Sequence, residues 1–351
     1  MRKTTYLMLA SVLALAACNS SSQPAGEATA DAAVSDAVVT VQAKGETQPV
    51  GTENEDAADD PAIWRNAANP DGSLIVATDK KAGLMVYDMT GKLRFSESSG
   101  RINNVDLADM GDKGVIVVAS DRNDPKNAGL GVWRLNTEKA SLTKLGTVPG
   151  GKGEGYGLCL WKHGSDLIAY SVMKDGSVSE IQITLGDKDA LSTKNLRTLK
   201  VPTQAEGCVV DQRDGTFYLG EEDAGIWRFA PGDSKGTIVA KDDGSRLVAD
   251  VEGLALLPNG DKAGWLVASS QGDNAYAVYT LPDVAFAGRF KIAQGKFGST
   301  EETDGIDLIG GSFGESYPDG LFVAQDGENG DKAQNFKLVS WADISKALGL
   351  K

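Results

Sequence analysis

The segment Glu206-Gly-Cys-Val-Val210 shows the pattern that decides the fold, an acidic residue followed by a small residue and an apolar run. Related segments occur six times, at Asp60-Pro-Ala-Ile-Trp64, Asp106-Leu-Ala, Glu154-Gly-Tyr-Gly-Leu158, Glu206-Gly-Cys-Val-Val210, Glu252-Gly-Leu-Ala-Leu256 and Asp304-Gly-Ile-Asp-Leu308. The acidic residues follow one another at separations of 46, 48, 52, 46 and 52 positions. Self-similarity at such a period indicates a repeat architecture. The spacing therefore predicts six copies of one structural unit.

Each repeat contains further short apolar runs separated by glycine-rich turns, such as residues 74–79 and 83–87 in the first. Runs of this kind are typical of β-strands, so the chain is expected to be all-β. A unit of about 50 residues with three or four strands has the size of a propeller blade. We expect a six-bladed β-propeller over residues 37–351 rather than two sandwiches, because radial closure protects sheet edges. Closure is expected to pair residues 38–41 with the last blade near 336–340, and a short helix is expected over 341–348.

The N-terminus has the features of an export signal. Arg2 and Lys3 precede an apolar run, and small residues lead to Leu15-Ala-Ala-Cys18. Residues 1–17 are too short for a membrane span with proper flanks and indicate a signal peptide. The tetrad resembles a bacterial lipobox, so Cys18 is the expected lipidation site; an ordinary signal peptide with a chance cysteine is the alternative. Residues 18–36, rich in Ser, Ala and Gly, are expected to form a flexible tether. The protein would then be exported and anchored to the cell envelope by its lipid, at the outer membrane if the cell has one.

Charge and cysteine content narrow the possible partners. The formal net charge of −14 argues against nucleic acid, because phosphate backbones attract basic surfaces. An acidic exported protein can collect divalent cations, although a soluble surface would give the same charge.

Cys159 and Cys208 both lie beside apolar residues. Two thiols in so long a chain favour buried free cysteines over a disulfide. We expect a monomer.

The repeated acids are the candidate functional residues. Equivalent positions of successive blades lie around one axis, so six acids are expected to surround one mouth of the central channel. Carboxylates confined together raise one another's pKa, which makes such a ring improbable without a counter-charge. Oxygen ligands without His or Cys favour calcium. The alternative is that each acid caps backbone amides in a turn.

Charged residues at the strand ends divide the repeats into two groups. Lys80, Arg122 and Lys174 follow apolar runs of the first three repeats, whereas acids and amides such as Glu222, Gln271 and Asp326 occupy the comparable places in the last three. A rim that is basic on one side and acidic on the other suits a polyanion held by both calcium and Lys or Arg. The alternative is that these lysines are ordinary solvated strand ends.

From about residue 55 to the C-terminus, the chain resembles the β-propeller phytases. The resemblance rests on Asp59-Asp60-Pro-Ala-Ile-Trp64, Thr78-Asp-Lys-Lys-Ala-Gly-Leu84, Asn103-Asn-Val-Asp106, Tyr156-Gly157, Glu221-Glu-Asp223, Asp250-Val-Glu-Gly253, Thr303-Asp-Gly-Ile-Asp307 and Phe322-Val-Ala-Gln-Asp-Gly-Glu-Asn329. It implies calcium-dependent removal of phosphate from phytate (myo-inositol hexakisphosphate). The calcium ligands that it implies are Asp59, Asp60, Asn104, Asp106, Glu206, Glu222, Glu252, Asp304, Asp326, Glu328 and Asn329. The phosphate contacts that it implies are Lys80, Arg122, Tyr156 and Lys174. The family often has an acid-rich loop before Thr303, whereas residues 295–302 read GKFGSTEE here, so one calcium site would be weaker or use Glu301 or Glu302.

The sequence carries none of the motifs of a covalent phosphatase. The sole histidine, His163, is not in an Arg-His-Gly-x-Arg-x-Pro motif, Cys208 and Arg213 are one residue too close for Cys-x5-Arg, and a Walker loop is absent. Direct attack of a calcium-held water on phosphorus remains, with Lys80, Arg122 and Lys174 stabilising charge and with Tyr156, Glu206 and Glu252 completing the expected catalytic set. The alternatives are a non-enzymatic surface propeller lipoprotein that binds a partner and a calcium-dependent propeller lactonase. The fold alone cannot separate these functions, but the Lys and Arg cluster favours a phosphate substrate.

Overall fold

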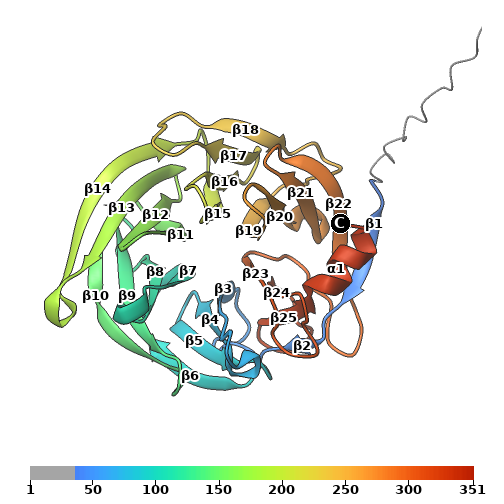
Figure 1. Ribbon diagram of the computed structural model, residues 1–351, viewed down its shortest axis with the longest axis horizontal. Helices are drawn as coiled ribbons and strands as arrows, with labels where there is room; N and C mark the ends of the chain where they lie inside the picture. Colours follow the sequence, from blue (N-terminus) through green and yellow to red (C-terminus); the bar gives the residue numbers. More distant parts are fainter. Residues whose placement is uncertain (1–35) are drawn as a thin grey trace, which may run out of the picture. The chain divides into compact units, whose positions relative to one another are not determined.

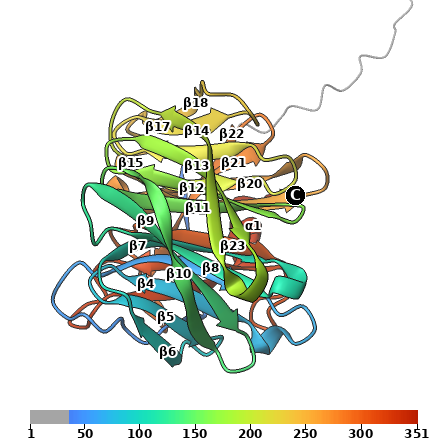
Figure 2. The same ribbon diagram turned by 90° about the vertical axis from the view of Figure 1, so that its left-hand side faces the viewer.

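The computed structural model describes residues 36–351, which form six β-sheets arranged as blades around a central axis (Figure 1). Blade 1 contains β3 (Ala58–Trp64), β4 (Leu74–Asp79), β5 (Gly83–Asp88) and β6 (Leu93–Ser98), and blade 2 contains β7 (Ile102–Asp109), β8 (Val115–Asp121), β9 (Asn127–Asn136) and β10 (Ser141–Lys152). Blade 3 contains β11 (Gly155–His163), β12 (Asp166–Met173), β13 (Ser177–Leu185) and β14 (Leu191–Lys200), and blade 4 contains β15 (Ala205–Val210), β16 (Phe217–Glu221), β17 (Gly225–Phe229) and β18 (Thr237–Lys241). Figure 2 shows blades 2 and 3 from the side, with their outer strands β10 and β14 next to one another.

Blades 5 and 6 include strands from the beginning of the described chain. Blade 5 contains β19 (Val251–Asn259), β20 (Ala263–Ser270), β21 (Ala275–Leu281), β22 (Ala285–Ala293) and β1 (Val38–Gln42), and blade 6 contains β23 (Ile306–Gly310), β24 (Gly320–Asp326), β25 (Asn335–Ser340) and β2 (Gly45–Glu46). Short 3-10 helices lie at Pro70–Gly72, Gly111–Lys113, Asp187–Asp189 and Gln271–Asp273. The prediction of an all-β, six-bladed propeller is confirmed. The expected signal peptide (1–17), the lipidation site Cys18 and most of the tether (18–36) lie outside the described residues.

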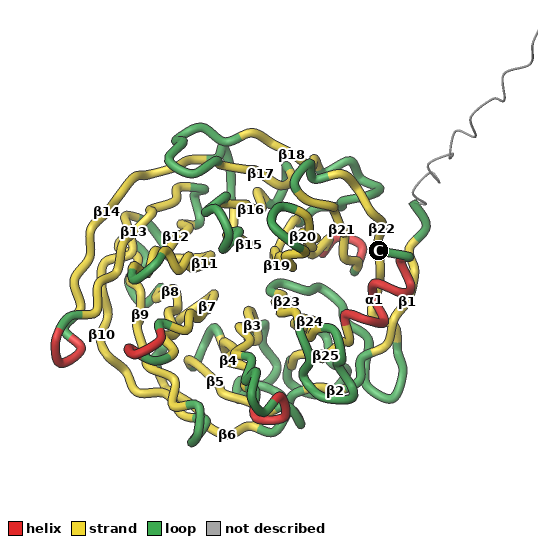
Figure 3. The backbone as a smooth tube through the Cα atoms, in the orientation of Figure 1, coloured by secondary structure: helices red, strands yellow, loops and turns green. Residues whose placement is uncertain are grey.

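The ring closes through two separate strands, which differs from the prediction. β1 pairs in parallel with β22, from Val38 opposite Arg289 to Gln42 opposite Ala293, and so adds a fifth strand to blade 5. The two-residue β2 pairs antiparallel with β25 and completes blade 6 (Figure 3). The expected pairing of residues 38–41 with residues 336–340 is therefore wrong. Val41 instead packs with Ile292 in the apolar cluster between blades 5 and 6.

The core is divided into six apolar clusters, one between each pair of neighbouring blades. The alternation of side chains along a strand explains this arrangement. In β4, Leu74 and Val76 face blade 2, whereas Ile75 and Ala77 face blade 6. Because both faces are covered, the strand reads as an unbroken apolar run in the sequence.

The single α-helix of the described residues, α1, spans Trp341–Leu348, as predicted. It packs Trp341 and Ile344 into the cluster between blades 5 and 6. It ends at Gly349, whose φ of 68° is the left-handed conformation that glycine favours at this position. Within residues 36–351, no helix has the length and apolar character needed to cross a membrane.

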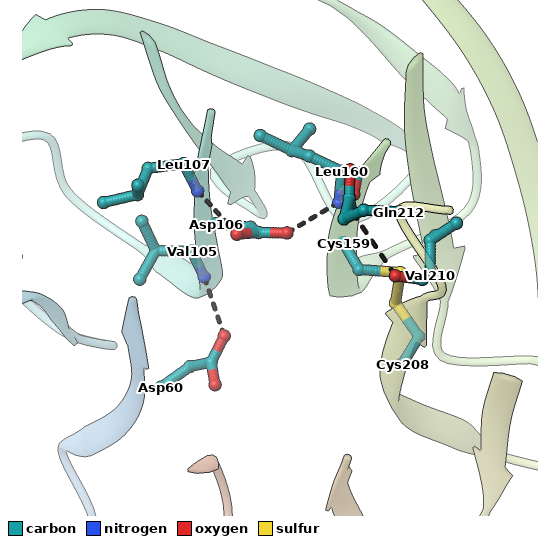
Figure 4. The surroundings of a disulfide bond; sticks show 9 residues. All are labelled: Asp60, Val105, Asp106, Leu107, Cys159, Leu160, Cys208, Val210 and Gln212. Atoms are coloured by element: carbon teal, nitrogen blue, oxygen red, sulfur yellow. Dashed lines mark hydrogen bonds between the residues drawn. A yellow bond between two sulfur atoms is a disulfide. The ribbon is translucent and has the colours of Figure 1, made fainter. Parts of the chain in front are cut away.

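Cys159 and Cys208 form a disulfide, so the expectation of free thiols is wrong (Figure 4). Cys159 lies on β11 and Cys208 on β15, the innermost strands of neighbouring blades, with their Cα atoms 5.8 Å apart. The two residues are 49 positions apart in the sequence, close to one repeat. In a propeller that separation places two cysteines on adjacent inner strands, which is the signal that counting cysteines alone misses.

Replacing both cysteines, Cys159→Ser with Cys208→Ser, should lower the free energy of unfolding by about 2–4 kcal/mol, because the unfolded chain loses a cross-link. Urea unfolding with and without a reducing agent measures this. The reducing agent should destabilise the wild-type protein and leave the double variant unchanged. Equal unfolding midpoints for oxidised and reduced wild-type protein would contradict a stabilising disulfide.

Candidate functional site

The strand register identifies the residues that occupy equivalent positions in the six blades. In each blade, the reference position is the innermost-strand residue at which continuous pairing with the second strand begins. These residues are Pro61, Val105, Leu158, Cys208, Leu254 and Ile306. Two positions before these residues lie Asp59, Asn103, Tyr156, Glu206, Glu252 and Asp304. We call these six residues the inner ring.

The inner ring corrects the prediction of six equivalent acids. Glu206, Glu252 and Asp304 are equivalent, as predicted, but Asp60, Asp106 and Glu154 are not in register with them. Asp60 lies one position after the inner ring, Asp106 lies three positions after it, and Glu154 lies two positions before it. The innermost strands of blades 1 to 5 contain a register irregularity at this point, so repeat spacing does not fix which side chain faces the axis.

Glycines bring the inner strands close to one another on the acidic side of the ring. A Cβ atom on Gly207 would lie 2.1 Å from the backbone oxygen of Glu252, and one on Gly157 would lie 1.9 Å from that of Glu206. The amide of Gly253 donates to the backbone oxygen of Asp304 at 2.8 Å. Because the backbones touch, side chains that begin at the inner ring share one small volume.

Three glutamates form the centre of the acidic side. Glu206, Glu222 and Glu252 each offer a carboxylate oxygen, and these oxygens lie within 4.8 Å of one another. Burial raises the pKa of Glu206 and Glu252, and nearby acids raise both further. One oxygen of Glu252 and both oxygens of Asp59 are buried without a hydrogen-bond partner among residues 36–351. Buried oxygens normally have a partner, so this set of hard ligands fits a divalent cation such as calcium.

Lys80 supplies positive charge at the edge of this cluster. Its Nζ atom lies 2.7 Å from Asp304 Oδ2, 2.9 Å from Asp56 Oδ1 and 3.6 Å from Asp59 Oδ2. Burial alone lowers the pKa of Lys80, but these carboxylates outweigh burial and hold the pKa above its ordinary value. Burial raises the pKa of Asp304 to about 7 despite the neighbouring lysine. Gln271 also donates to Asp304, at 2.8 Å.

A basic strip, formed by Arg122 and Lys174, lies on the other side of the inner ring. Arg122 and Lys174 flank the ring of Tyr156, at 5.6 and 5.1 Å from its centroid. Arg122 donates to Asn103 and, from Nη2 at 2.7 Å, to Glu154. Lys80, Arg122 and Lys174 each follow the second strand of their blade, where Glu222, Gln271 and Gly327 stand in blades 4 to 6. The basic places in blades 1 to 3 are as predicted, but only Glu222 of the equivalent residues in blades 4 to 6 is an acid.

Three aspartates and one asparagine line the channel beyond the inner ring. Asp60, Asn104, Asp106 and Asp307 border a cavity of about 60 Å³. Asp60 accepts from the amide of Val105 at 3.0 Å, Asp106 from that of Leu160 at 2.7 Å, and Asp307 from that of Ile63 at 2.8 Å. Figure 4 shows the first two of these bonds. Each bond joins the innermost strands of two neighbouring blades, so these acids cap backbone amides, the alternative noted above.

Asn104, the other predicted ligand in the channel, lies against the acidic cluster. With its amide nitrogen turned toward the nearest acceptors, it donates to Glu206 at 2.9 Å and to the backbone oxygen of Tyr156 at 3.0 Å. Sequence reasoning did not single out Asn103 or Gln204, whose side chains donate to Glu206 and Glu222. Asn103 falls in the quoted segment 103–106. Its equivalence to Glu206 is the feature of the sequence that could have identified it.

The remaining predicted ligands lie in a separate place. Asp326 ends β24, Glu328 and Asn329 follow it, and the three line a pocket of about 500 Å³ together with Glu46 and Glu301. We call this the outer pocket. The eleven predicted ligands therefore divide into a channel-mouth group, a channel-interior group and an outer group.

Comparison with known proteins identifies the family of the chain. The sequence profile of the phytase family matches residues 3–351. The 3-phytase of Bacillus subtilis (strain 168) is 40% identical over 331 residues, which cover 88% of this chain and 85% of the relative. A profile match over nearly the whole chain, together with this identity, shows that the protein belongs to the phytase family.

Proposed function

We propose that this protein is a calcium-dependent phosphomonoesterase that hydrolyses phytate. The observation that carries the proposal is the buried cluster of Glu206, Glu222 and Glu252 near the basic strip of Arg122 and Lys174, with oxygens of Glu252 and Asp59 that accept no hydrogen bond from residues 36–351. Membership of the phytase family and the identity with a 3-phytase support the same substrate and reaction.

The acidic half would hold the cation. Glu206, Glu222, Glu252, Asp59 and Asp304 offer only oxygen atoms, which calcium prefers, and they are too close together to carry full charge without a counter-ion. When bound, calcium supplies Lewis acidity for the attack of water on phosphorus. Asn103 and Gln204 orient the carboxylates by donating to Glu206 and Glu222.

The basic half would bind phosphate. Arg122, Lys174 and Lys80 present N–H donors toward which phosphate oxygens are attracted, and they neutralise charge that develops in the transition state. Glu154 and the ring of Tyr156 hold Arg122 in position. Gln204 donates both to the hydroxyl of Tyr156 and to Glu222, so the two halves are adjacent and a substrate with neighbouring phosphates can engage both at once.

Covalent catalysis by histidine or cysteine does not fit the arrangement. His163 stands at the end of β11 and packs on Trp161, with the ring centroids 4.4 Å apart. Cys159 and Cys208 are joined to each other. Neither type of nucleophile belongs to the inner ring, so direct attack of water is the reaction that the site supports.

Phosphate release from phytate tests the proposal. We expect treatment with a chelator to reduce the rate by at least about a hundredfold, corresponding to several kcal/mol of transition-state stabilisation by the metal. Added calcium should restore the rate, and the same concentration of magnesium should not. Calcium-independent phosphate release would contradict the role of the acidic half. Hydrolysis of lactones without phosphate release, or partner binding without hydrolysis, would favour the two alternatives.

A further inference from the structure

Lys337 is a fully buried lysine whose ammonium group is surrounded by oxygen atoms. The side chain has an exposed fraction of 0%. Its Nζ atom lies 2.8 Å from Glu46 Oε2, 2.9 Å from Asn335 Oδ1, 3.0 Å from Asp326 Oδ2 and 3.1 Å from Asn329 Oδ1. Two carboxylates and two amide oxygens thus converge on one cation.

The fold places this ammonium group at the base of the outer pocket, against Glu46, Asp326 and Asn329 of its lining. Lys337 pairs with Ala324 in the middle of β25, so its side chain leaves the sheet on a fixed face. The loop over residues 295–302 closes above it: a Cβ atom on Gly298 would lie only 3.1 Å from Nζ. The register of β25 and the glycine in the loop therefore hold the charge at the position where the four oxygens meet.

The four oxygens have the chemistry of a calcium site. Carboxylate and side-chain amide oxygens are the ligands that calcium takes in proteins. Asp326 and Asn329 belong to the ligands that the family resemblance implied, but the ammonium group already occupies the centre between their side chains. A metal does not fit there as well, because two cations at one position repel each other.

We propose that Lys337 is a built-in cation that takes the place of a metal ion in the outer pocket. This inference goes beyond the proposed function, since it concerns how the last blade is held together. Glu46 belongs to the closing strand β2, Asp326 ends β24, and Asn329 lies in the loop that follows. The ammonium group joins these segments, so closure of blade 6 is independent of calcium.

Hydrogen exchange on the full chain tests the proposal. In the wild-type protein, the protection of amides 44–47 and 326–335, measured relative to the amides of blades 3 and 4, should be the same in chelator and in calcium. Lys337→Met keeps most of the side chain's length but leaves the buried Asp326 and the partly buried Glu46 without this counter-charge. In chelator, these amides should exchange about a hundredfold faster in this variant than in wild type. Calcium should restore the protection, whereas sodium at equal ionic strength should not.

Lys332→Met is the matched control, because Lys332 lines the same pocket but is exposed. Its exchange should match the wild type in both conditions. Selective loss of protection at residues 44–47 and 326–335 in the chelated wild-type protein would overturn the proposal, as would a Lys337→Met variant on which calcium has no effect.

A crystal of the calcium-loaded wild-type protein gives an answer even if Lys337→Met does not fold. We expect the ammonium group of Lys337 among its four oxygens, without anomalous calcium signal in the outer pocket. A calcium ion between Asp326 and Glu328, with the lysine turned away, would refute the proposal.

Discussion

Glu206→Gln is expected to reduce phytate hydrolysis by at least about a thousandfold while the propeller stays folded. Glu206 lies at the centre of the acidic cluster, within reach of Glu222 and Glu252. Asn103 and Asn104 also converge on it. Glutamine keeps the shape of the side chain but removes one negative charge from the site that holds the cation. Steady-state rates at saturating calcium measure the effect.

The same substitution should stabilise the protein in the absence of metal. Burial and the charges of Asp59, Glu252 and Asp304 disfavour an ionised carboxylate at this position, so an uncharged amide relieves the repulsion. In chelator above pH 7, the unfolding midpoint of Glu206→Gln should therefore lie above that of the wild type. A gain in stability together with a loss of activity identifies a residue that serves function rather than folding.

Glu221→Gln provides the matched control, because Glu221 is a buried neighbour with a structural set of partners. Its oxygens accept from the amide and hydroxyl of Thr203, both at 2.6 Å, and from Trp227 Nε1 at 2.8 Å. Replacement leaves at least one of these donors without an acceptor and should cost about 1–3 kcal/mol of stability while keeping the turnover rate. Normal turnover by folded Glu206→Gln would exclude the acidic cluster from catalysis.

The parts of the site that the sequence predicts are those fixed by strand ends. Lys80, Arg122 and Lys174 each stand directly after a second strand, and the end of an apolar run is visible in the sequence. The count of six blades follows in the same way from the repeat period. For these features, the spacing of residues along the sequence is enough to predict their places in the fold.

The parts that the sequence does not predict depend on register and on long-range contacts. A shift of one residue moves a side chain to the other face of a strand, which is why Asp59, and not Asp60, occupies the inner ring. The register irregularity that causes this shift has no marker in the repeat. The partners of Lys337 come from residues 46, 326, 329 and 335, so its role emerges only when the ring closes.

The stability of the metal-free protein is expected to fall as the pH rises from about 4 to about 7. Burial raises the pKa of Asp304 and of Asp106 to about 7, and that of Asp307 to about 6, from an ordinary value of 3.8. Between the ordinary and the raised value, the folded protein holds protons that the unfolded chain has already released. Stability therefore decreases with rising pH in this range, and one carboxyl shifted from 3.8 to about 7 corresponds to on the order of 4 kcal/mol.

Calcium should reverse this dependence, since a bound cation favours the ionised carboxylates that a neutral pH produces. Urea unfolding at pH 5, 6, 7 and 8, in chelator and in calcium, measures both effects. The two curves should converge at pH 5, where protons occupy the acids, and should separate most at pH 8. Asp304→Asn should flatten the curve in chelator, because it removes one carboxyl whose pKa is raised. A metal-free protein that gains stability from pH 5 to pH 7 would contradict the argument, since it would mean that the buried carboxylates are already neutralised by the protein itself.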